Sequence, residues 1–250
     1  MRLSAWTHQF KLIEKKNTMR YGGSTIADSI QKRTEKQHDT MIIGIFLSIV
    51  GGFLDAYSYL LKGKVFANAQ TGNLIFLCLS LAKHEFHKLH KYIIPIFAFA
   101  VGILVSEVLK NQKFIRNYDR MIAVLVFEAL VIAGIGFLDA SFSYDMINSI
   151  ISFIAAIQVA NFDKVDGNPI ATTMITGNLR SSMINLAKYH ALKDKKYLVS
   201  MRKYFIIIGS FGIGVIIGLH AIEFYAEKSL WLCELFLLLA FIMIQKEEHE

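Results

Sequence analysis

The chain has 250 residues, of which 54% are hydrophobic and only 19% are charged. A water-soluble protein of this length needs more polar residues to cover its surface, so the composition excludes a conventional soluble enzyme. With 2 Pro, 2 Cys and 16 Gly that follow no period, collagen-like, disordered and disulfide-stapled chains are excluded as well. The net charge of +7 suits basic residues that flank membrane helices better than it suits binding to nucleic acid.

Residues 1–40 are polar and carry eight basic residues. They lack the apolar core and small-residue cleavage site of a secretory signal peptide. We expect a basic cytoplasmic tail, either loosely solvated or in part an amphipathic helix on the membrane surface.

Six apolar runs follow, each long enough to cross the hydrocarbon core of a bilayer as a helix. Backbone amides in lipid must be bonded within the segment, which makes helix the expected structure. The runs cover residues 41–61, 92–110, 121–139, 145–162, 203–222 and 230–245. The expected fold is an all-α membrane protein, a polytopic helix bundle with six long transmembrane helices and two short or broken segments.

The two short segments share a sequence pattern. Thr-Gly-Asn-Leu occurs at residues 71–74 and again at 176–179, and Leu-Ala-Lys occurs at 81–83 and 186–188, each pair 105 residues apart. A fixed offset across two matched stretches indicates a repeat. We therefore expect membrane repeats at 41–139 and 140–245, with a short tail at 246–250. Each short segment either crosses the membrane or enters it and returns; the excess of basic residues favours the second arrangement, and the amino terminus is cytoplasmic in both. In a third arrangement, an extended stretch such as residues 65–70 meets a half-helix that starts at the triplet, and the pair crosses together.

The stretch from residue 51 to residue 82 resembles a motif of the YoaK-type integral membrane family, a bacterial group classed as a domain of unknown function. The resemblance implies a multi-spanning inner-membrane protein and brings no established activity. The matching residues are Gly51, Gly52, Asp55, Ala56, Phe66, Asn68, Thr71, Gly72 and Asn73, with Gln158, Thr172, Thr173, Thr176 and Gly177 in the second half.

Asp55 is a carboxylate within the first span, where an ionised group costs at least about 2.5–3.5 kcal/mol unless it faces protein or water. It is either a proton or cation site or a hydrogen-bonded structural group. The glycines before it, Gly51 and Gly52, suit close helix packing or a kink.

The two Thr-Gly-Asn triplets stand at the starts of the broken segments, where a helix presents partial positive charge. Two breaks at matched positions of two repeats point to a transporter-style binding site near the membrane centre. In the alternative reading, the threonines only cap the helices and the asparagines only bond neighbouring backbone. The candidate substrate-binding residues are Asp55, Asn68, Thr71, Gly72, Asn73, Gln158, Thr173, Thr176, Gly177, Asn178 and Arg180.

Three further charged residues lie in the segments expected in the membrane, Arg180 in the second short segment and two acids in long runs. Arg180 either holds an anionic solute or pairs with Asp55, or extends to lipid headgroups. Glu128 and Glu234 are acids at nearly matching places in the two halves, and they serve either as proton carriers or as hydrogen-bonded links between helices. Together with Asp55 they are the candidates for proton coupling.

These features favour a secondary transporter or permease for a small solute, with an anion among the candidates, in the bacterial inner membrane. The alternative is a membrane scaffold that binds partners and transports nothing. Phosphate loops and zinc or serine hydrolase motifs do not occur in the sequence, so we expect no enzyme, no cofactor and no metal. The expected partners are the bilayer, a solute and a proton; substrate and oligomeric state are left open.

Overall fold

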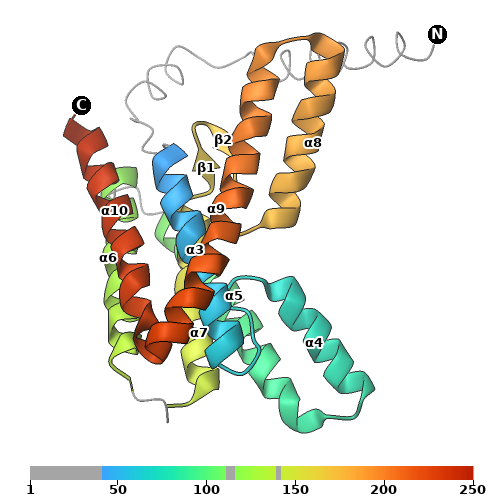
Figure 1. Ribbon diagram of the computed structural model, residues 1–250, viewed down its shortest axis with the longest axis vertical. Coiled ribbons are helices and arrows are strands. Elements are labelled where there is room, and N and C mark those ends of the chain that lie inside the picture. Colours follow the sequence, from blue (N-terminus) through green and yellow to red (C-terminus); the bar gives the residue numbers. More distant parts are fainter. Residues whose placement is uncertain (1–40, 111–115, 139–141, 250) are drawn as a thin grey trace.

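The computed structural model describes residues 41–110, 116–138 and 142–249, which are almost entirely helical (Figure 1). The amino-terminal tail predicted at residues 1–40 lies outside the described residues. The elements in chain order are α3 (Met41–Leu61), α4 (Gln70–Ala82), η1 (Phe86–Lys88), α5 (Leu89–Lys110), α6 (Asn117–Gly136), α7 (Tyr144–Asn161), β1 (Lys164–Val165), β2 (Asn168–Pro169), α8 (Ile175–Leu192), α9 (Lys195–Tyr225), η2 (Ala226–Ser229) and α10 (Leu230–His249).

The protein is an all-α membrane protein, as predicted. Three helical stretches among the described residues are long and apolar enough to cross a membrane, and they cover Met41–Leu61, Phe86–Lys110 and Lys195–Lys246. The third stretch contains both α9 and α10, which are separated by the short helix η2. The count of six crossing helices and the division into two repeats stay predictions.

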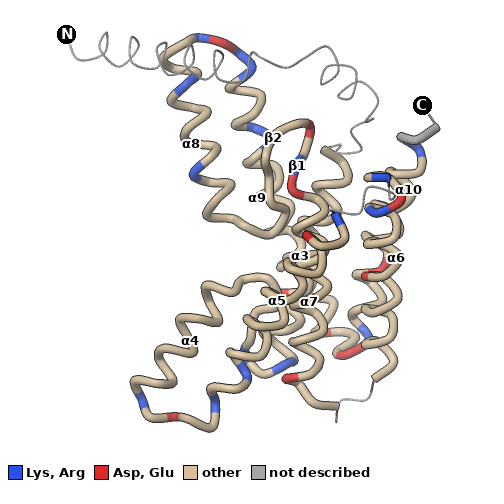
Figure 2. The backbone as a smooth tube through the Cα atoms, turned by 180° about the vertical axis from the view of Figure 1, so that it is seen from behind, with Lys and Arg blue, Asp and Glu red and all other residues tan. Residues whose placement is uncertain are grey.

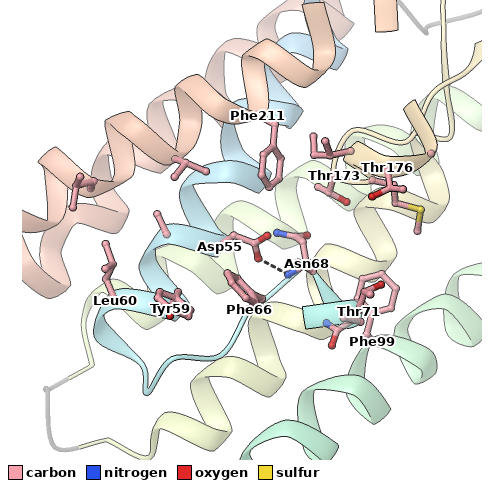
Figure 3. A pocket seen from close by; sticks show the side chains of 18 residues that line it. Asp55, Tyr59, Leu60, Phe66, Asn68, Thr71, Phe99, Thr173, Thr176 and Phe211 are labelled. Carbon is pink, nitrogen blue, oxygen red and sulfur yellow. Dashed lines mark hydrogen bonds between the residues drawn. The ribbon is translucent and has the colours of Figure 1, made fainter. Parts of the chain in front are cut away.

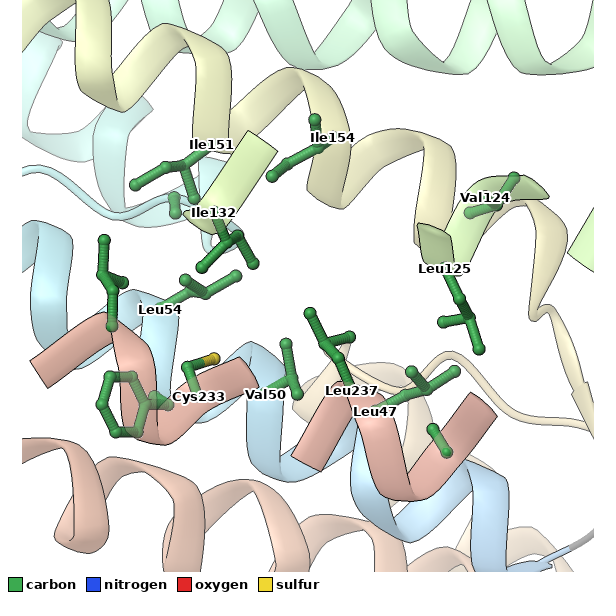
Figure 4. Close-up of a cluster of buried hydrophobic side chains, with 14 of the residues drawn as sticks. Leu47, Val50, Leu54, Val124, Leu125, Ile132, Ile151, Ile154, Cys233 and Leu237 are labelled. Carbon is green, nitrogen blue, oxygen red and sulfur yellow. The ribbon is translucent and has the colours of Figure 1, made fainter. Parts of the chain in front are cut away.

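Helix α3 runs through the bundle, where it contacts α9 along one side and α10 along another, while α7 packs on α5 and α6. Apolar side chains from four of these helices form one continuous core (Figure 4). Burying such side chains between helices in lipid stabilises this core through van der Waals packing. Its central members are Leu47, Val50, Leu54, Leu125, Ile132, Ile151, Ile154, Cys233 and Leu237.

Small residues let the helices approach closely at two crossings, which confirms the packing role predicted for Gly52. A Cβ atom on Gly52 would overlap the backbone of Phe211 on α9, and one on Gly214 would overlap the carbonyl of Ile49 on α3. At the second crossing, a Cβ on Gly102 of α5 would lie 2.6 Å from the Phe153 carbonyl oxygen on α7. Helices in lipid gain van der Waals contact from such close approach.

The end of α3 is tied to two other elements by buried polar groups. Lys62 is 1% exposed, and its Nζ lies 2.7 Å from Glu227 Oε2 of η2. The Tyr57 hydroxyl donates to the same oxygen at 2.6 Å, and Asn148 Nδ2 on α7 donates to the Lys62 carbonyl oxygen at 2.7 Å. These bonds satisfy groups whose burial without partners would be costly.

Helices α4 and α8, predicted as the two short segments, have 13 and 18 residues, so α8 is as long as α7. Both start near the middle of the molecule and extend toward opposite ends (Figure 1). Each forms a hairpin with the helix that follows it, α4 with α5 and α8 with α9. Figure 2 shows charged residues gathered at the turns that close these two hairpins. Non-helical chain leads into both starts: residues 62–69 before α4, and residues 162–174 with the β1–β2 hairpin before α8.

Candidate functional site

A cavity of about 710 Å³ lies between the two hairpins, and both short helices begin at its wall. Asp55 of α3, Thr71 of α4 and Thr176 of α8 line the same cavity, together with Phe211 of α9 (Figure 3). The structure thus brings together residues that are far apart in the sequence. A volume of several hundred cubic ångströms is typical of pockets that hold small molecules.

Asp55 connects α3 to the chain that leads into α4. Asp55 is 4% exposed, and its Oδ1 accepts a hydrogen bond from the backbone amide of Asn68 at 2.7 Å (Figure 3). The Asn68 side chain donates from Nδ2 to the Gly51 carbonyl oxygen at 3.0 Å, whereas its Oδ1 is buried without a hydrogen-bond partner. A buried acceptor without a donor is costly, so a donor that reached Asn68 Oδ1 would be stabilising.

The start of α4 is held by Asn73, which lies one turn inside the helix and is fully buried. Its Oδ1 accepts from the Phe66 amide at 2.9 Å, and its Nδ2 donates to the Phe66 carbonyl oxygen at 2.7 Å and to Gln70 Oε1 at 2.8 Å. Gly72 does not line the cavity; a Cβ there would lie 2.7 Å from the Phe66 ring, so this glycine makes room for the aromatic side chain.

The start of α8 is built in a related way. Asn178 Nδ2 donates to the Ala171 carbonyl oxygen at 2.7 Å, seven residues earlier in the chain, as Asn73 does to Phe66. The methyl group of Thr173 fills the space beside Gly51 of α3. The two asparagines therefore fix the backbone, and neither lines the cavity.

The alternative reading of the triplets is right about the asparagines, which bond neighbouring backbone, and wrong about the threonines, which do not cap the helices. The N-cap residues are Ala69 for α4 and Met174 for α8, and neither makes a side-chain capping bond. The first amides of a helix have no partner within the helix, so uncapped starts present donors and partial positive charge. Thr71 and Thr176 lie within the first turn of their helices, with the cavity beside them.

The candidate substrate-binding residues divide into those that line the cavity and those that do not. The cavity is lined by Asp55, Asn68, Thr71, Thr173, Thr176 and Gly177. Outside it lie Gly72, Asn73, Asn178, Gln158 and Arg180. The Arg180 side chain is exposed on α8, and no ion pair joins it to Asp55 among the described residues.

Gln158 belongs to a second polar group, in which it donates from Nε2 to both carboxylate oxygens of Glu128, at 3.0 and 2.9 Å. Glu128 is 1% exposed, so the pair is a hydrogen-bonded link between α6 and α7. Glu234 of α10 lines a separate groove of about 520 Å³ between α6 and α10. Neither acid reaches the central cavity, so a coupling role for them would have to act through helix movement.

Sequence reasoning missed most of the apolar lining of the cavity. Tyr59, Phe99 and Phe211 come from three different helices, and a single apolar residue in an apolar run carries no signal of its role. Phe66, which matched the family motif, stacks on Tyr59 with ring centroids 4.9 Å apart. Gln70 also lines the cavity, and its place directly before the first triplet is the signal that could have identified it.

Comparison with known proteins now gives the family. Residues 43–243 match the family described as "Protein of unknown function (DUF1275)". The chain belongs to this family. It is also similar to the UPF0700 transmembrane protein YoaK of Bacillus subtilis (strain 168), with 24% identity over 187 residues, which covers 72% of this chain and 83% of that protein. No solved structure matches the chain.

The family match and the YoaK relative confirm the resemblance to the YoaK-type family that the motif in residues 51–82 indicates. The matched region contains every described residue that lines the central cavity. Membrane localisation follows from the transmembrane relative and from the apolar helices.

Proposed function

We propose that the protein is a secondary transporter or permease for a small solute, and that the solute binds in the central cavity. The observation that carries the proposal is the meeting of two uncapped helix starts and one buried carboxylate, Asp55, at a single cavity. Interrupted helices at membrane depth are tolerated only where they pack in protein or line a wet cavity. In transporters, such interruptions form the substrate site. The proposal involves no covalent chemistry.

The proposed topology has six crossing helices and two half-helices, in two halves of opposite orientation in the inner membrane. Helices α4 and α8 start at one cavity and point to opposite ends, as inverted halves require. In this arrangement six lysines fall on the external side and 20 Lys and Arg residues on the internal side. Arg180 is not counted because it lies within a membrane segment and not in a connection. This bias supports a cytoplasmic amino terminus.

Matched hydrogen bonds support the duplication. Asn73 and Asn178, which are 105 residues apart, each donate to the carbonyl oxygen seven residues before them. The pairing of helices is also reciprocal: the first helix of each proposed half, α3 or α7, packs on the third helix of the other half, α9 or α5. Rocking of one half against the other around the cavity is the motion that this arrangement suits.

The test is uptake into proteoliposomes, screened over a panel of small organic acids, amines, amino acids and neutral solutes. We expect uptake of at least one class by the wild type and a loss of at least tenfold in Asp55→Asn. Glu107→Gln is the matched control, because Glu107 is exposed near the end of α5, outside the cavity, and this variant should transport normally.

A steric variant makes the test independent of Asp55, whose carboxylate also fixes the chain before α4. Gly177 lines the cavity, and a Cβ there would meet no atom within 4 Å, so Gly177→Leu should obstruct part of the cavity without disturbing the fold. Uptake that survives both substitutions would overturn the proposed site. A folded wild-type protein that takes up no solute in the panel would favour the scaffold alternative.

A further inference from the structure

The charges around the central cavity are of both signs and lie close together, which restricts the class of solute. This inference rests on the proposed function. Asp55 supplies a carboxylate, and the starts of α4 and α8 supply partial positive charge. Because Asp55 Oδ1 accepts from the Asn68 amide at 2.7 Å, two residues before α4 begins, the negative group is adjacent to one of the positive helix starts.

A solute with only one charge fits this cavity poorly. No Lys, Arg or His side chain lines it within the described part of the chain, so an anion would meet Asp55 without a compensating cationic side chain. A simple cation would be attracted by Asp55 and repelled by the two helix starts. A molecule with neighbouring positive and negative groups satisfies both.

The unused acceptor of Asn68 supports a donor in the solute. Asn68 is 8% exposed, its Oδ1 has no hydrogen-bond partner, and the residue lines the cavity beside Asp55 (Figure 3). An ammonium group carries three donors and no acceptor, which matches one carboxylate and one amide oxygen on the same wall. A carboxylate on the solute would in turn accept from amides in the first turn of α8, whereas at α4 the amides of Gln70 and Gly72 already donate to the carbonyl oxygens of Asn68 and Ala69.

Apart from Gln70 and three threonines, the rest of the cavity wall is apolar, with aromatic side chains set among aliphatic ones. Phe66 of the segment before α4, Phe99 of α5 and Phe211 of α9 line it, and aliphatic side chains fill the gaps between them. Such a wall binds an apolar or aromatic body by burial and by ring packing, and a volume of about 710 Å³ accommodates a side chain as large as a phenyl group.

We infer that the cavity binds a zwitterionic solute of the amino-acid class with a large apolar or aromatic side chain. The solute's ammonium group contacts Asp55 and Asn68, its carboxylate lies at the start of α8, and its side chain lies against the phenylalanines. The narrower prediction is that neither the ammonium group nor the carboxylate of the solute suffices alone for tight binding.

Three probes that share one ring and differ in charged groups test this assignment. Binding of L-phenylalanine, 2-phenylethylamine and 3-phenylpropionate is measured by calorimetry on the full chain in lipid nanodiscs. We expect L-phenylalanine to bind at least tenfold more tightly than either singly charged probe. Equal or tighter binding of the amine or of the acid would overturn the inference, as would the absence of L-phenylalanine binding.

Two variants locate the binding. Asp55→Asn should remove the preference of L-phenylalanine over 3-phenylpropionate, because the carboxylate that attracts the ammonium group is gone. Gly177→Leu should abolish binding of all three probes, and Gly209→Leu is its matched control, since Gly209 on α9 is also free of neighbours within 4 Å and does not line the cavity. Binding that Gly177→Leu leaves intact would refute this location even if Asp55→Asn fails to fold.

The uptake assay separates this inference from the proposed function. Binding of L-phenylalanine without uptake would refute transport and leave the assigned class standing. Uptake of a different class, blocked by Gly177→Leu and without L-phenylalanine binding, would refute the assigned class and leave transport standing.

Discussion

Two glycines on the same helix, Gly214 and Gly212 of α9, should respond to alanine with opposite signs. A Cβ on Gly214 would overlap the carbonyl oxygen of Ile49 and lie 2.8 Å from its Cα and carbonyl carbon. A Cβ on Gly212 would meet no atom within 4 Å. The chemical change is identical, and only the neighbouring helix differs.

The expected magnitudes follow from these contacts. A carbon and an oxygen atom in contact are about 3.3 Å apart, so α3 and α9 would have to separate by roughly 1 Å to relieve the overlap of the new methyl group at Gly214 with the Ile49 carbonyl oxygen. Overpacking of this kind costs about 1–3 kcal/mol, and the contacted atoms are backbone, which cannot rotate away. Gly212→Ala should instead stabilise the protein by about 0.5–1 kcal/mol, because alanine is the better helix former.

Both variants are compared with the wild type by thermal and denaturant unfolding in the same detergent, followed by tryptophan fluorescence and by circular dichroism. The free energies of unfolding should differ by about 1.5–4 kcal/mol between the two variants. If Gly214→Ala proves as stable as Gly212→Ala, the close crossing of α3 and α9 is incorrect.

Three other substitutions test the polar contacts, each by its effect on unfolding. Asn73→Ala should cost about 2–3 kcal/mol and Asn178→Ala about 1 kcal/mol, because the first side chain makes three hydrogen bonds and the second makes one; equal losses would contradict the assigned bonds. Lys62→Met should lower the free energy of unfolding by about 2 kcal/mol, which is less than the loss expected for a fully buried ion pair because Glu227 is 22% exposed. A double variant that adds Glu227→Gln should recover part of this loss, and no recovery would argue against the ion pair. Asp194 accepts from the Lys196 amide at the start of α9, and this bond holds the pKa of Asp194 below its usual range. Its stabilisation is present above the pKa of the unfolded chain and is lost as the pH falls through the lower folded-state pKa. The difference in melting temperature between wild type and Asp194→Asn, which keeps an acceptor oxygen and removes the charge, should therefore shrink below about pH 4, and a constant difference would count against a lowered pKa of Asp194.

Hydropathy located the long helices of the bundle because it reports which segments tolerate lipid. It located their ends less well. Helix α9 begins at Lys195, whereas the apolar run begins at residue 203, because polar turns capped by Asp194 are helical without being apolar. For the same reason α10 continues to His249, beyond the predicted end of its span at residue 245.

The repeated triplets led to the cavity that is the candidate site, because matched breaks in two apolar segments require a common explanation. They led to Thr71, Thr176 and Gly177 at the cavity wall, and equally to Asn73 and Asn178, which turned out to fix backbone outside it. A motif marks a region of chain without separating side chains that face a cavity from those that shape the turn. The aromatic wall depends on which helices meet, and no local pattern carries that information.

The unequal anchoring of the two half-helices has a mechanical consequence. Three bonds from Asn73 clamp the entry to α4, whereas a single bond from Asn178 holds the entry to α8. By these bonds the α8 entry is the softer of the two, and a solute bound as proposed would deform it first. Deuterium uptake at residues 174–178 should accordingly exceed uptake at 69–73 in the empty protein and fall more steeply on saturation.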